Sequence, residues 1–364
     1  MQIIDVAVRR WTLPLRAPFR IATRTALEAL NVTIAVRTSN PDITGYGASA
    51  PVMYVTGESV ESVVETVNAA AEALVGKSCD RLGVLLKSIT PQMAGSPAAL
   101  AGLEMALYDL WAKQAGISLW NFLGGSEMSI ATDLTIPLTS AGEGAEIARN
   151  AYASGIRTFK IKVGHDDGFA TDLARIDAII KASPGCNVRI DANQAFHADE
   201  ALEFLDALRP HRDVIELIEQ PVDRQDMDGL RKVRDRSGYP IFADEAACSP
   251  ADVMNLIHAD AVDGINVKLM KSGITAALDI MAICRSAGKK LMIGCMLESG
   301  VGISAAAAIA AGTGAFDCID LDSHKLLAPI PGLEDGFTSD GECLVIRRNA
   351  LGWGVSPPSA IFCE

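Results

Sequence analysis

The stretch Arg157-Thr-Phe-Lys-Ile-Lys-Val163 is the first of several short apolar runs that each end in charged or polar residues. Its β-branched and aromatic residues predict a buried strand, and Lys160 and Lys162 lie at the end of that strand. The run Val188-Arg-Ile-Asp-Ala-Asn193 follows the same pattern and carries Asp191 at its end. Five later runs end in the same manner, at Glu219, Asp244, Lys268, Met296 and Asp320.

The spacing of these strand ends is regular. Counted from Lys162, successive ends are separated by 29, 28, 25, 24, 28 and 24 residues. One strand, one helix and two short loops occupy about that length, so each interval matches a βα unit. In a parallel barrel the carboxyl ends of the strands share one rim, where active sites form. With a first strand at Thr132 to Pro137, the pattern predicts eight strands and a (β/α)7β TIM-like barrel.

Helical spacing of apolar residues fills the intervals between the predicted strands. Seven helices are expected, at Gly144 to Ala153, Phe169 to Ala182, Asp199 to Leu208, Met227 to Arg236, Pro250 to His258, Ile274 to Ala287 and Gly302 to Ala311.

The residues before the barrel predict a smaller α+β domain that caps it. Alternating apolar residues predict three strands, and helical spacing predicts two helices. These elements are Ile3 to Arg10, Leu30 to Val36, Gly45 to Ala50, Ser59 to Val75 and Pro97 to Gln114. Two stretches, Pro14 to Arg24 and Pro51 to Gly57, are expected to be irregular loops that cover a site built elsewhere.

The chain is therefore divided into three expected parts. Residues 1–125 form the capping domain and residues 126–325 the catalytic barrel. Residues 326–364 show no further βα period, and we expect them to pack back on the capping domain.

Composition narrows the class of protein. Half of the residues are apolar and 21% are charged, which is typical of an ordered globular chain. A formal net charge of −13 without a basic cluster argues against a nucleic-acid partner. The eight cysteines form no C-x-x-C pair, so free thiols in the cytoplasm are expected. No signal peptide or membrane span is predicted, and we expect a homo-oligomer without a membrane partner.

Three consecutive strand ends carry carboxylates: Asp191, Glu219 and Asp244. Neighbouring barrel strands lie roughly 4.8 Å apart, so the three side chains can meet at one point. Such close carboxylates repel one another unless a cation neutralises them. Ligation by oxygen alone favours a hard ion, Mg²⁺ before Mn²⁺. The alternative, three ordinary carboxylates that each cap the next helix, does not explain their common period.

The lysines are expected to be the acid/base groups. Lys160 and Lys162 are two residues apart, so they face the same side of their strand, toward the barrel interior. Beside a metal ion and beside each other, their pKa values should fall, which lets one act as a base. Lys268 stands four strands away, across the barrel. The alternative is that Lys162 and Lys268 only form salt bridges with the rim carboxylates. Lys271 is expected to be an exposed loop residue.

This set of groups suits the removal of a proton next to a carboxylate. The proton is weakly acidic because its loss leaves a dianionic enolate, and turnover at about 10 per second leaves a barrier of roughly 16 kcal/mol. A metal ion on the substrate carboxylate, with Lys160 beside it, would stabilise the developing charge. Two lysines on opposite sides of one carbon can remove a proton from one face and return it to the other.

Seven motifs extend over both predicted domains. They are Lys160-Ile-Lys162, Asp191-Ala-Asn193, Glu219-Gln-Pro221, Ala243-Asp-Glu245, Asn266-Val-Lys-Leu-Met-Lys-Ser272, Ala106-Leu-Tyr-Asp-Leu110 and Leu119-Trp-Asn-Phe-Leu-Gly-Gly125. With them the sequence resembles the muconate-lactonising subgroup of the enolase superfamily over essentially its whole length. The resemblance implies Mg²⁺ held by Asp191, Glu219 and Asp244. It also implies Lys162 and Lys268 as the acid/base pair, under the two covering loops.

The eighth strand end narrows the reaction. Asp320-Leu-Asp322 resembles the Asp-x-Asp motif of dipeptide epimerases, where the pair binds the free ammonium group of the substrate. Two carboxylates can hold one cationic amino terminus, so the choice is physically reasonable. The resemblance thus implies an isomerase that inverts the C-terminal α-carbon of a dipeptide. The alternative for the two aspartates is a pair that only caps a helix. The alternatives for the function are a cycloisomerase, an N-acylamino acid racemase or a metal-bearing binding protein.

The preferred dipeptide depends on the covering residues. Arg24 falls where Ala-Glu epimerases of the family carry an arginine that pairs with the glutamate side chain, which implies L-Ala-L-Glu as the first substrate. The stretches Lys290 to Met296 and Thr313 to Phe316 resemble members that prefer bulky apolar residues, and that alternative stays open. Thr135 and Cys295 are further expected rim contacts of the substrate.

Overall fold

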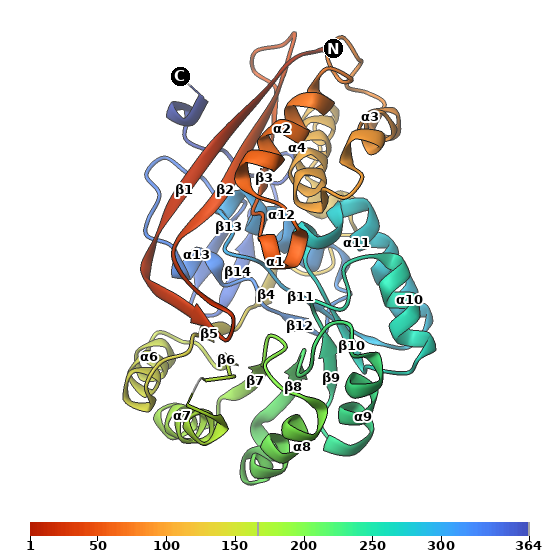
Figure 1. The fold of residues 1–364 in the computed structure, drawn as a ribbon. Coiled ribbons are helices and arrows are strands. Elements are labelled where there is room, and N and C mark those ends of the chain that lie inside the picture. Colours follow the sequence, from red (N-terminus) through yellow and green to blue (C-terminus); the bar gives the residue numbers. More distant parts are fainter. Residues whose placement is uncertain (166, 363–364) are drawn as a thin grey trace.

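The computed structural model describes residues 1–165 and 167–362 (Figure 1). The N-terminal part holds an antiparallel sheet in the order β1-β2-β3, formed by β1 (Ile3–Ile21), β2 (Arg24–Thr38) and β3 (Thr44–Ser49). The helical elements that accompany this sheet are α1 (Met53–Thr56), α2 (Val60–Ala71), α3 (Leu82–Ile89), η1 (Thr90–Met93), α4 (Pro97–Ala115) and α5 (Leu119–Phe122).

Helix α4 packs closely against strand β3. A Cβ atom on Gly45 would lie 2.2 Å from the carbonyl oxygen of Ala106, and one on Gly47 would lie 2.0 Å from that of Gly102. Only glycine therefore allows the strand and the helix backbones to approach this closely. The contact makes α4 the centre of the capping domain.

The stretch Pro14 to Arg24 is not the irregular loop that we predicted. Strand β1 runs through almost all of it, and its register with β2 shifts between Pro14 and Phe19. Prolines are tolerated here because β1 is the edge strand of its sheet. The tip of this hairpin reaches the barrel beside β5, where Leu138 N donates to the Arg20 carbonyl (Figure 1). The second predicted loop contains the short helix α1.

The barrel predicted from the spacing of strand ends is confirmed. Eight strands form one sheet in the order β12-β11-β10-β9-β8-β7-β6-β5, with parallel pairing along it. The strands are β5 (Leu134–Ile136), β6 (Thr158–Lys162), β7 (Asn187–Asp191), β8 (Ile215–Glu219), β9 (Ile241–Ala243), β10 (Gly264–Val267), β11 (Lys290–Ile293) and β12 (Cys318–Ile319). The helices that follow them are α6 (Ala141–Ala153), α7 (Phe169–Ala182), α8 (Ala198–Ala207), η2 (Arg209–Val214), α9 (Met227–Ser237), α10 (Pro250–His258), α11 (Leu269–Ser286), α12 (Gly300–Thr313) and α13 (Ser323–Leu326).

Side chains join the two end strands, β5 and β12. Thr132 Oγ1 accepts a hydrogen bond of 2.7 Å from Leu321 N, and Asp322 Oδ2 accepts one of 2.6 Å from Thr135 N. A longer backbone bond of 3.3 Å runs from Asp133 N to Ile319 O. The residues around the Asp-x-Asp motif therefore also close the seam of the barrel.

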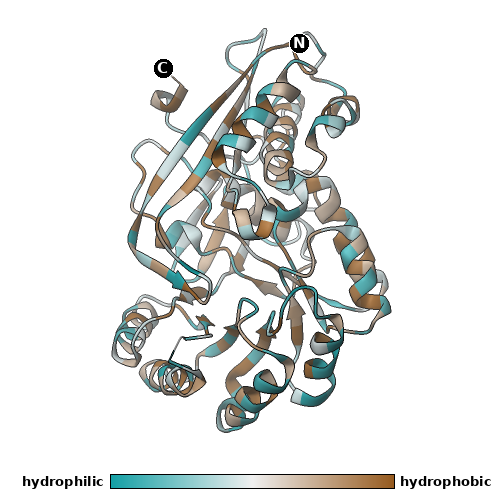
Figure 2. Cartoon of the chain, in the orientation of Figure 1, coloured by the Kyte–Doolittle hydropathy of each residue, from teal (hydrophilic) through white to brown (hydrophobic). Residues whose placement is uncertain are grey.

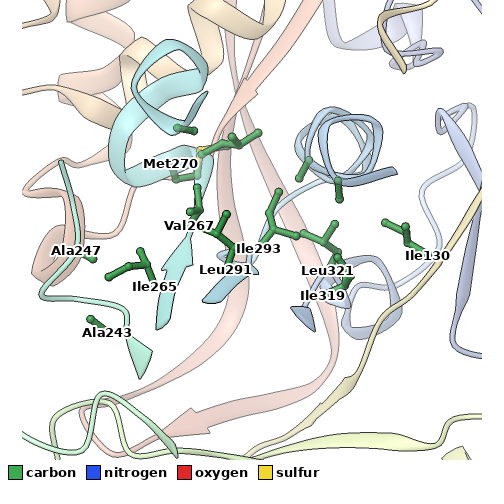
Figure 3. Close-up of a cluster of buried hydrophobic side chains, with 14 of the residues drawn as sticks. Ile130, Ala243, Ala247, Ile265, Val267, Met270, Leu291, Ile293, Ile319 and Leu321 are labelled. Atoms are coloured by element: carbon green, nitrogen blue, oxygen red, sulfur yellow. The ribbon is translucent and has the colours of Figure 1, made fainter. Parts of the chain in front are cut away.

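Apolar side chains fill the space between the barrel strands and the helices. In Figure 2 the short barrel strands are mostly hydrophobic, whereas the helices show both hydrophobic and hydrophilic residues. Figure 3 shows side chains of β10, β11 and β12 gathered with Met270 of α11. Met270 also reaches the capping domain, where its sulfur accepts from Ala50 N at 3.2 Å. In addition, Glu104 of α4 accepts from Ile274 N of α11 at 2.5 Å. These contacts fix the capping domain on the barrel.

The C-terminal residues contact both parts of the molecule. Strands β13 (Phe337–Asp340) and β14 (Cys343–Ile346) extend a small antiparallel sheet that begins at β4 (Ser129–Ala131), and the turn η3 (Ser359–Phe362) follows. Trp353 Nε1 donates to Met105 O of α4 at 2.9 Å. The ring of Phe362 stacks on that of Tyr46 at 6.2 Å. Among the described residues, no helix is both long and apolar enough to cross a membrane.

Candidate active site

One cavity at the carboxyl ends of the barrel strands collects most of the residues predicted for the site. Nine of the eleven line it: Arg24, Thr135, Lys160, Lys162, Asp244, Lys268, Cys295, Asp320 and Asp322. The other two, Asp191 and Glu219, lie behind Lys160, whose Nζ atom is 3.0 Å from Asp191 Oδ2 and 2.8 Å from Glu219 Oε2. The structure thus brings together side chains from residue 24 to residue 322.

The register of the sheet explains why the first rim residues meet. Lys162 pairs with Asp191 across β6 and β7, and Asp191 pairs with Glu219 across β7 and β8. Lys162 Nζ donates to Asp191 Oδ2 at 2.5 Å. The second oxygen of Asp191 accepts from Asn193 N at 3.0 Å. Glu219 is held in a similar way, because its Oε1 atom accepts from Asn266 Nδ2 at 2.8 Å.

The opposite wall of the cavity carries a second lysine–carboxylate pair. Lys268 Nζ donates to Asp244 Oδ2 at 2.6 Å. Lys271 binds the other oxygen, Asp244 Oδ1, at 2.7 Å, and only 3% of its surface is exposed. The prediction that Lys271 is an exposed loop residue is therefore wrong. Its backbone N–H bonds to the carbonyl of Lys268, so the first turn of α11 directs the side chain inward behind Asp244.

For most of the buried lysines and carboxylates of the site, neighbouring charges shift the pKa in the direction opposite to burial. Burial alone would lower the pKa values of Lys160 and Lys268, but the surrounding carboxylates, Asp191 and Asp244 foremost, outweigh it and raise both. Burial would likewise raise the pKa of Asp191 and that of Asp244, but the nearby lysines bring both below their ordinary range. Glu219 keeps a raised pKa through burial and the charge of Asp191. The carboxylates of the protein thus oppose the fall in pKa that we predicted for lysines beside a metal ion.

The three carboxylates at 191, 219 and 244 supply the oxygen ligands that suit a hard cation. Their oxygens lie 2.5–3.0 Å from lysine ammonium groups, so the position attracts positive charge. Among the described residues the three do not form a group whose ligand oxygens all lie within 4.8 Å of one another, so the lysines hold apart the carboxylates that we predicted to meet at one point. Among the residues that the structure describes, Glu219 Oε2 has no partner of hydrogen-bond geometry despite its 2.8 Å approach to Lys160. The buried oxygens Asn193 Oδ1 and Glu245 Oε2 also lack such a partner. Burial and the charge of Asp244 raise the pKa of Glu245 to about 7.

A second acidic cluster lies at the eighth strand end. In residues 1–165 and 167–362, Asp133, Asp320 and Asp322 form a group in which one carboxylate oxygen from each residue lies within 4.8 Å of the other two. Asp320 Oδ2 accepts from Lys160 Nζ at 2.8 Å, and Asp133 Oδ2 accepts from Arg189 Nη1 at 2.8 Å. Burial and the charge of Asp320 raise the pKa of Asp322 to about 6. The cluster is therefore rich in negative charge and attracts a cationic ligand group.

The capping domain supplies the outer wall of the cavity. Arg24, the first residue of β2, is exposed, and its guanidinium carbon lies 4.7 Å from the centre of the Tyr54 ring in α1. Apolar side chains line the same cavity, and these are Phe19, Ile21, Val55, Met296, Leu297 and Leu326. Burial, followed by the charge of Asp320, raises the pKa of the Cys295 thiol well above its ordinary value.

Several residues of the site were missed by sequence reasoning. Lys271 and Glu245 belong to motifs that were recognised. Their positions close to Lys268 and Asp244 in the sequence could have identified them as residues of the site. Asp133 precedes the first barrel strand, so the regular spacing of strand ends did not indicate it. Tyr54 lies in a stretch that was treated as an irregular loop.

Comparisons with known proteins agree with this arrangement. Residues 3–124 match the mandelate racemase / muconate lactonizing enzyme N-terminal domain, and residues 143–359 match the enolase C-terminal domain-like family. An L-Ala-D/L-Glu epimerase of Bacillus subtilis is 37% identical over 330 residues, 90% of each chain. A hydrophobic dipeptide epimerase of Enterococcus faecalis is 35% identical over 361 residues, which are 98% of this chain and 100% of that protein.

A solved structure is also similar to this chain over nearly its whole length. The dipeptide epimerase of Enterococcus faecalis complexed with Mg and the dipeptide L-Leu-L-Tyr has a TM-score of 0.92 and 34% identity, over 98% of this chain and 100% of that one. The fold and the site thus define a class of protein: a barrel enzyme with a capping domain and with lysines and carboxylates at the rim of the barrel. The chain belongs to the enolase superfamily, and its dipeptide-epimerase relatives make it an isomerase. The resemblance predicted from the motifs is confirmed.

Proposed function

We propose that this chain is a Mg²⁺-dependent dipeptide epimerase that inverts the C-terminal α-carbon of L,L-dipeptides, with L-Ala-L-Glu as the first substrate. One observation carries the proposal. Lys162 and Lys268 line one cavity, each paired with a different carboxylate, and the acidic Asp320 and Asp322 line the same cavity. A proton-transfer pair and a binding site for an amino terminus are thus available to one small substrate.

The two lysines are proposed to transfer the proton. They come from strands that are four positions apart in the eight-stranded sheet, so they enter the cavity from opposite walls. The deprotonated lysine on one face takes the α-proton, and the ammonium group on the other face returns a proton. Which lysine acts as the base on the L,L isomer stays open.

The enolate that forms between these steps carries extra negative charge on the substrate carboxylate. Asp191, Glu219 and Asp244 are the residues that would hold Mg²⁺, with Mn²⁺ as the alternative. The bound ion would supply Lewis-acid stabilisation of the enolate oxygens. Lys160, which is 1% exposed and fixed by carboxylates, is proposed to place its positive charge beside the same oxygens.

The opposite end of the dipeptide is assigned to the Asp320 and Asp322 carboxylates. A free ammonium group there would be held by charge-assisted hydrogen bonds, and it would offset the burial and the repulsion from Asp320 that together raise the pKa of Asp322. Thr135 keeps Asp322 in place through its backbone N–H and lines the cavity beside it. This part of the site distinguishes a dipeptide from an N-acylated substrate, which has no ammonium group.

Arg24 is proposed to recognise the glutamate side chain. Among the described residues its guanidinium group has no carboxylate partner within 4.0 Å, and it borders the cavity beside Tyr54. A bidentate pair with a substrate carboxylate would satisfy it. A second candidate is a dipeptide with a bulky apolar C-terminal residue. The apolar lining, Phe19 and Leu326 included, favours that candidate, and Cys295 would contact either side chain.

A screen in D₂O tests the proposal. A library of L,L-dipeptides is incubated with the protein and Mg²⁺, and deuterium at the C-terminal α-carbon is read as a mass increase of one unit. The proposal expects the increase together with the L,D product, first of all for L-Ala-L-Glu. Epimerised dipeptide without deuterium would refute the mechanism. Exchange in N-acylamino acids but not in dipeptides would favour a racemase instead. Tight binding without any exchange would favour a metal-bearing binding protein.

The proposal includes three features predicted from the sequence. The domain boundary at residue 125 is supported by the separate sheets on either side of it, whereas the boundary at residue 325 stays a prediction and falls within α13 (Ser323–Leu326). A homo-oligomer and a cytoplasmic location complete the proposal, and gel filtration and cell fractionation would test them.

A further inference from the structure

The three proposed metal-binding carboxylates share one arrangement. In each, one oxygen, the inner oxygen, lies against a lysine that lines the cavity, and the other accepts a hydrogen bond from a different group, which we call the outer donor. For Asp191 the outer donor is the backbone N–H of Asn193 at 3.0 Å, and for Glu219 it is the side-chain amide of Asn266 at 2.8 Å. The outer bond fixes the rotation of each carboxylate and leaves the inner oxygen directed at the lysine.

Asp244 differs because its outer donor is charged. The ammonium group of Lys271 binds Asp244 Oδ1 at 2.7 Å, while Lys268 binds Asp244 Oδ2 at 2.6 Å. Lys271 also donates to the carbonyl oxygens of Asp244 at 2.6 Å and Asn266 at 2.8 Å. One side chain therefore ties the end of β9 to the end of β10, the two strands that carry Asp244 and Lys268.

These contacts exclude Lys271 from proton transfer. An ammonium group has three N–H donors, and all three of Lys271 are used by protein acceptors. The side chain is 3% exposed and is not part of the cavity lining. A buried, fully bonded cation that touches neither substrate nor cavity acts through its neighbours.

We propose that Lys271 is a positioning residue that holds Asp244 for the metal ion and thereby sets the affinity of the site. The inference rests on the proposed function, since it takes Asp244 as a metal ligand. Without Lys271, Asp244 Oδ1 and the carbonyl oxygens of Asp244 and Asn266 each lose one hydrogen bond, although Ala247 N still donates to the Asp244 carbonyl. Asp244 can then turn both carboxylate oxygens toward Lys268. That rotation would withdraw the inner oxygen from the metal position and bind Lys268 more tightly.

Two effects compete when the charge is removed. Loss of a nearby positive charge should strengthen the attraction of the site for a cation. Loss of the outer donor should weaken binding, and the removal of such partners typically costs 10- to 100-fold in metal affinity. We expect the second effect to dominate because three hydrogen bonds are lost at once in a buried site.

The test is a calorimetric titration of the full-length protein with Mg²⁺, which measures the dissociation constant of the ion. For Lys271→Met we expect a dissociation constant about 10- to 100-fold higher than that of the wild type. Lys271→Gln, which keeps two N–H donors, should recover part of the loss. At saturating Mg²⁺ the variant should regain most of its turnover, because a residue that only positions a ligand is compensated by a higher metal concentration.

Lys113→Met is the matched control. Lys113 also bonds to an aspartate, Asp109 Oδ2 at 2.6 Å, and to a backbone carbonyl, that of Thr44 at 3.0 Å, but in the capping domain. It should lower the melting temperature without changing the dissociation constant for Mg²⁺. If Lys271→Met does not fold, the titration of Lys271→Gln decides.

The outcomes separate the inference from the function on which it rests. Unchanged or tighter Mg²⁺ binding by a folded Lys271 variant would overturn the positioning role. Asp244→Ala provides the other arm, and it should abolish Mg²⁺ binding. If Asp244→Ala binds Mg²⁺ as tightly as the wild type, Asp244 is not a ligand and the proposed metal site itself is wrong.

Discussion

The rim of the barrel and the edge of the capping domain form one cavity but are built in different ways. On the rim, Lys160 is 1% exposed and Asp191 is fully buried, and each has several charged partners. On the cap, Arg24 is exposed and is held by one ring, that of Tyr54. A cation–π contact at an exposed site contributes about 0.5–1 kcal/mol, whereas breaking a buried ion pair typically costs about 3–5 kcal/mol.

This difference indicates a division of labour. The buried network pre-organises the groups proposed to do the chemistry, because its side chains cannot move without leaving charges unpaired. The cap carries the residues proposed to contact the variable part of a substrate, on a hairpin and a short helix that accept substitution more readily. We therefore expect changes at the rim to abolish the reaction and changes at the cap to alter the choice of substrate.

Removal of divalent metal should give the largest effect. Dialysis against EDTA is expected to lower epimerisation of L-Ala-L-Glu by at least about 10⁴-fold, because the enolate then loses its main stabilising charge. Activity should return on addition of Mg²⁺. A chelated enzyme that keeps more than a tenth of its activity would break the assignment of the rim to metal chemistry.

Replacement of the proposed ammonium contact comes next. Asp320→Asn should lower kcat/KM for a dipeptide by roughly 10- to 160-fold, mainly through KM, because a charge-assisted bond of about 1.5–3 kcal/mol is lost and Lys160 loses a partner. The N-acetylated dipeptide provides the comparison. If the variant handles free and acetylated dipeptides in the same ratio as the wild type, the Asp-x-Asp motif does not bind the amino terminus.

A change on the cap should affect one substrate and spare another. Arg24→Ala is expected to lower kcat/KM for L-Ala-L-Glu about 10- to 100-fold and to leave L-Ala-L-Leu within about twofold. Tyr54→Leu should reduce activity toward L-Ala-L-Glu only about threefold, as expected for the loss of a weak positioning contact. Equal losses for both dipeptides would remove the distinction between cap and rim.

The pH dependence should give an effect of only a few fold. Burial and Asp320 raise the pKa of Asp322 to about 6, so below that pH the carboxyl group is protonated and neutral in the free enzyme. Binding of a dipeptide ammonium group should then weaken, and kcat/KM should fall about fivefold between pH 6 and pH 5. The fall should appear in KM. A kcat/KM that stays constant down to pH 5 would show that the charge of Asp322 is not needed for binding.

The two regions also differ in how far the sequence predicts them. The period of the strand ends predicted the barrel and the grouping of the rim residues, because side chains at the ends of parallel strands must face one rim. The hairpin β1–β2 was mistaken for a loop because its prolines mask an edge strand. Lys271 was misplaced because its burial depends on how α11 begins behind Asp244, which residue spacing does not show.

Other features needed the three-dimensional structure for a similar reason. Asp133 joins the acidic cluster only because β5 meets β12 at the seam of the barrel, a contact between distant parts of the chain. The approach of Tyr54 to Arg24 links two segments of the cap that no sequence period relates. Long-range contacts of this kind leave no mark on local patterns.

The central claim is that two lysines serve opposite faces of one carbon, and single-lysine variants in D₂O test it most directly. Lys162→Ala and Lys268→Ala are each incubated with L-Ala-L-Glu and, separately, with L-Ala-D-Glu at saturating Mg²⁺. We predict that neither variant interconverts the epimers, and that each still exchanges the α-proton of one epimer, a different one for each variant. Exchange of the same epimer by both variants, or of both epimers by either, would contradict the account.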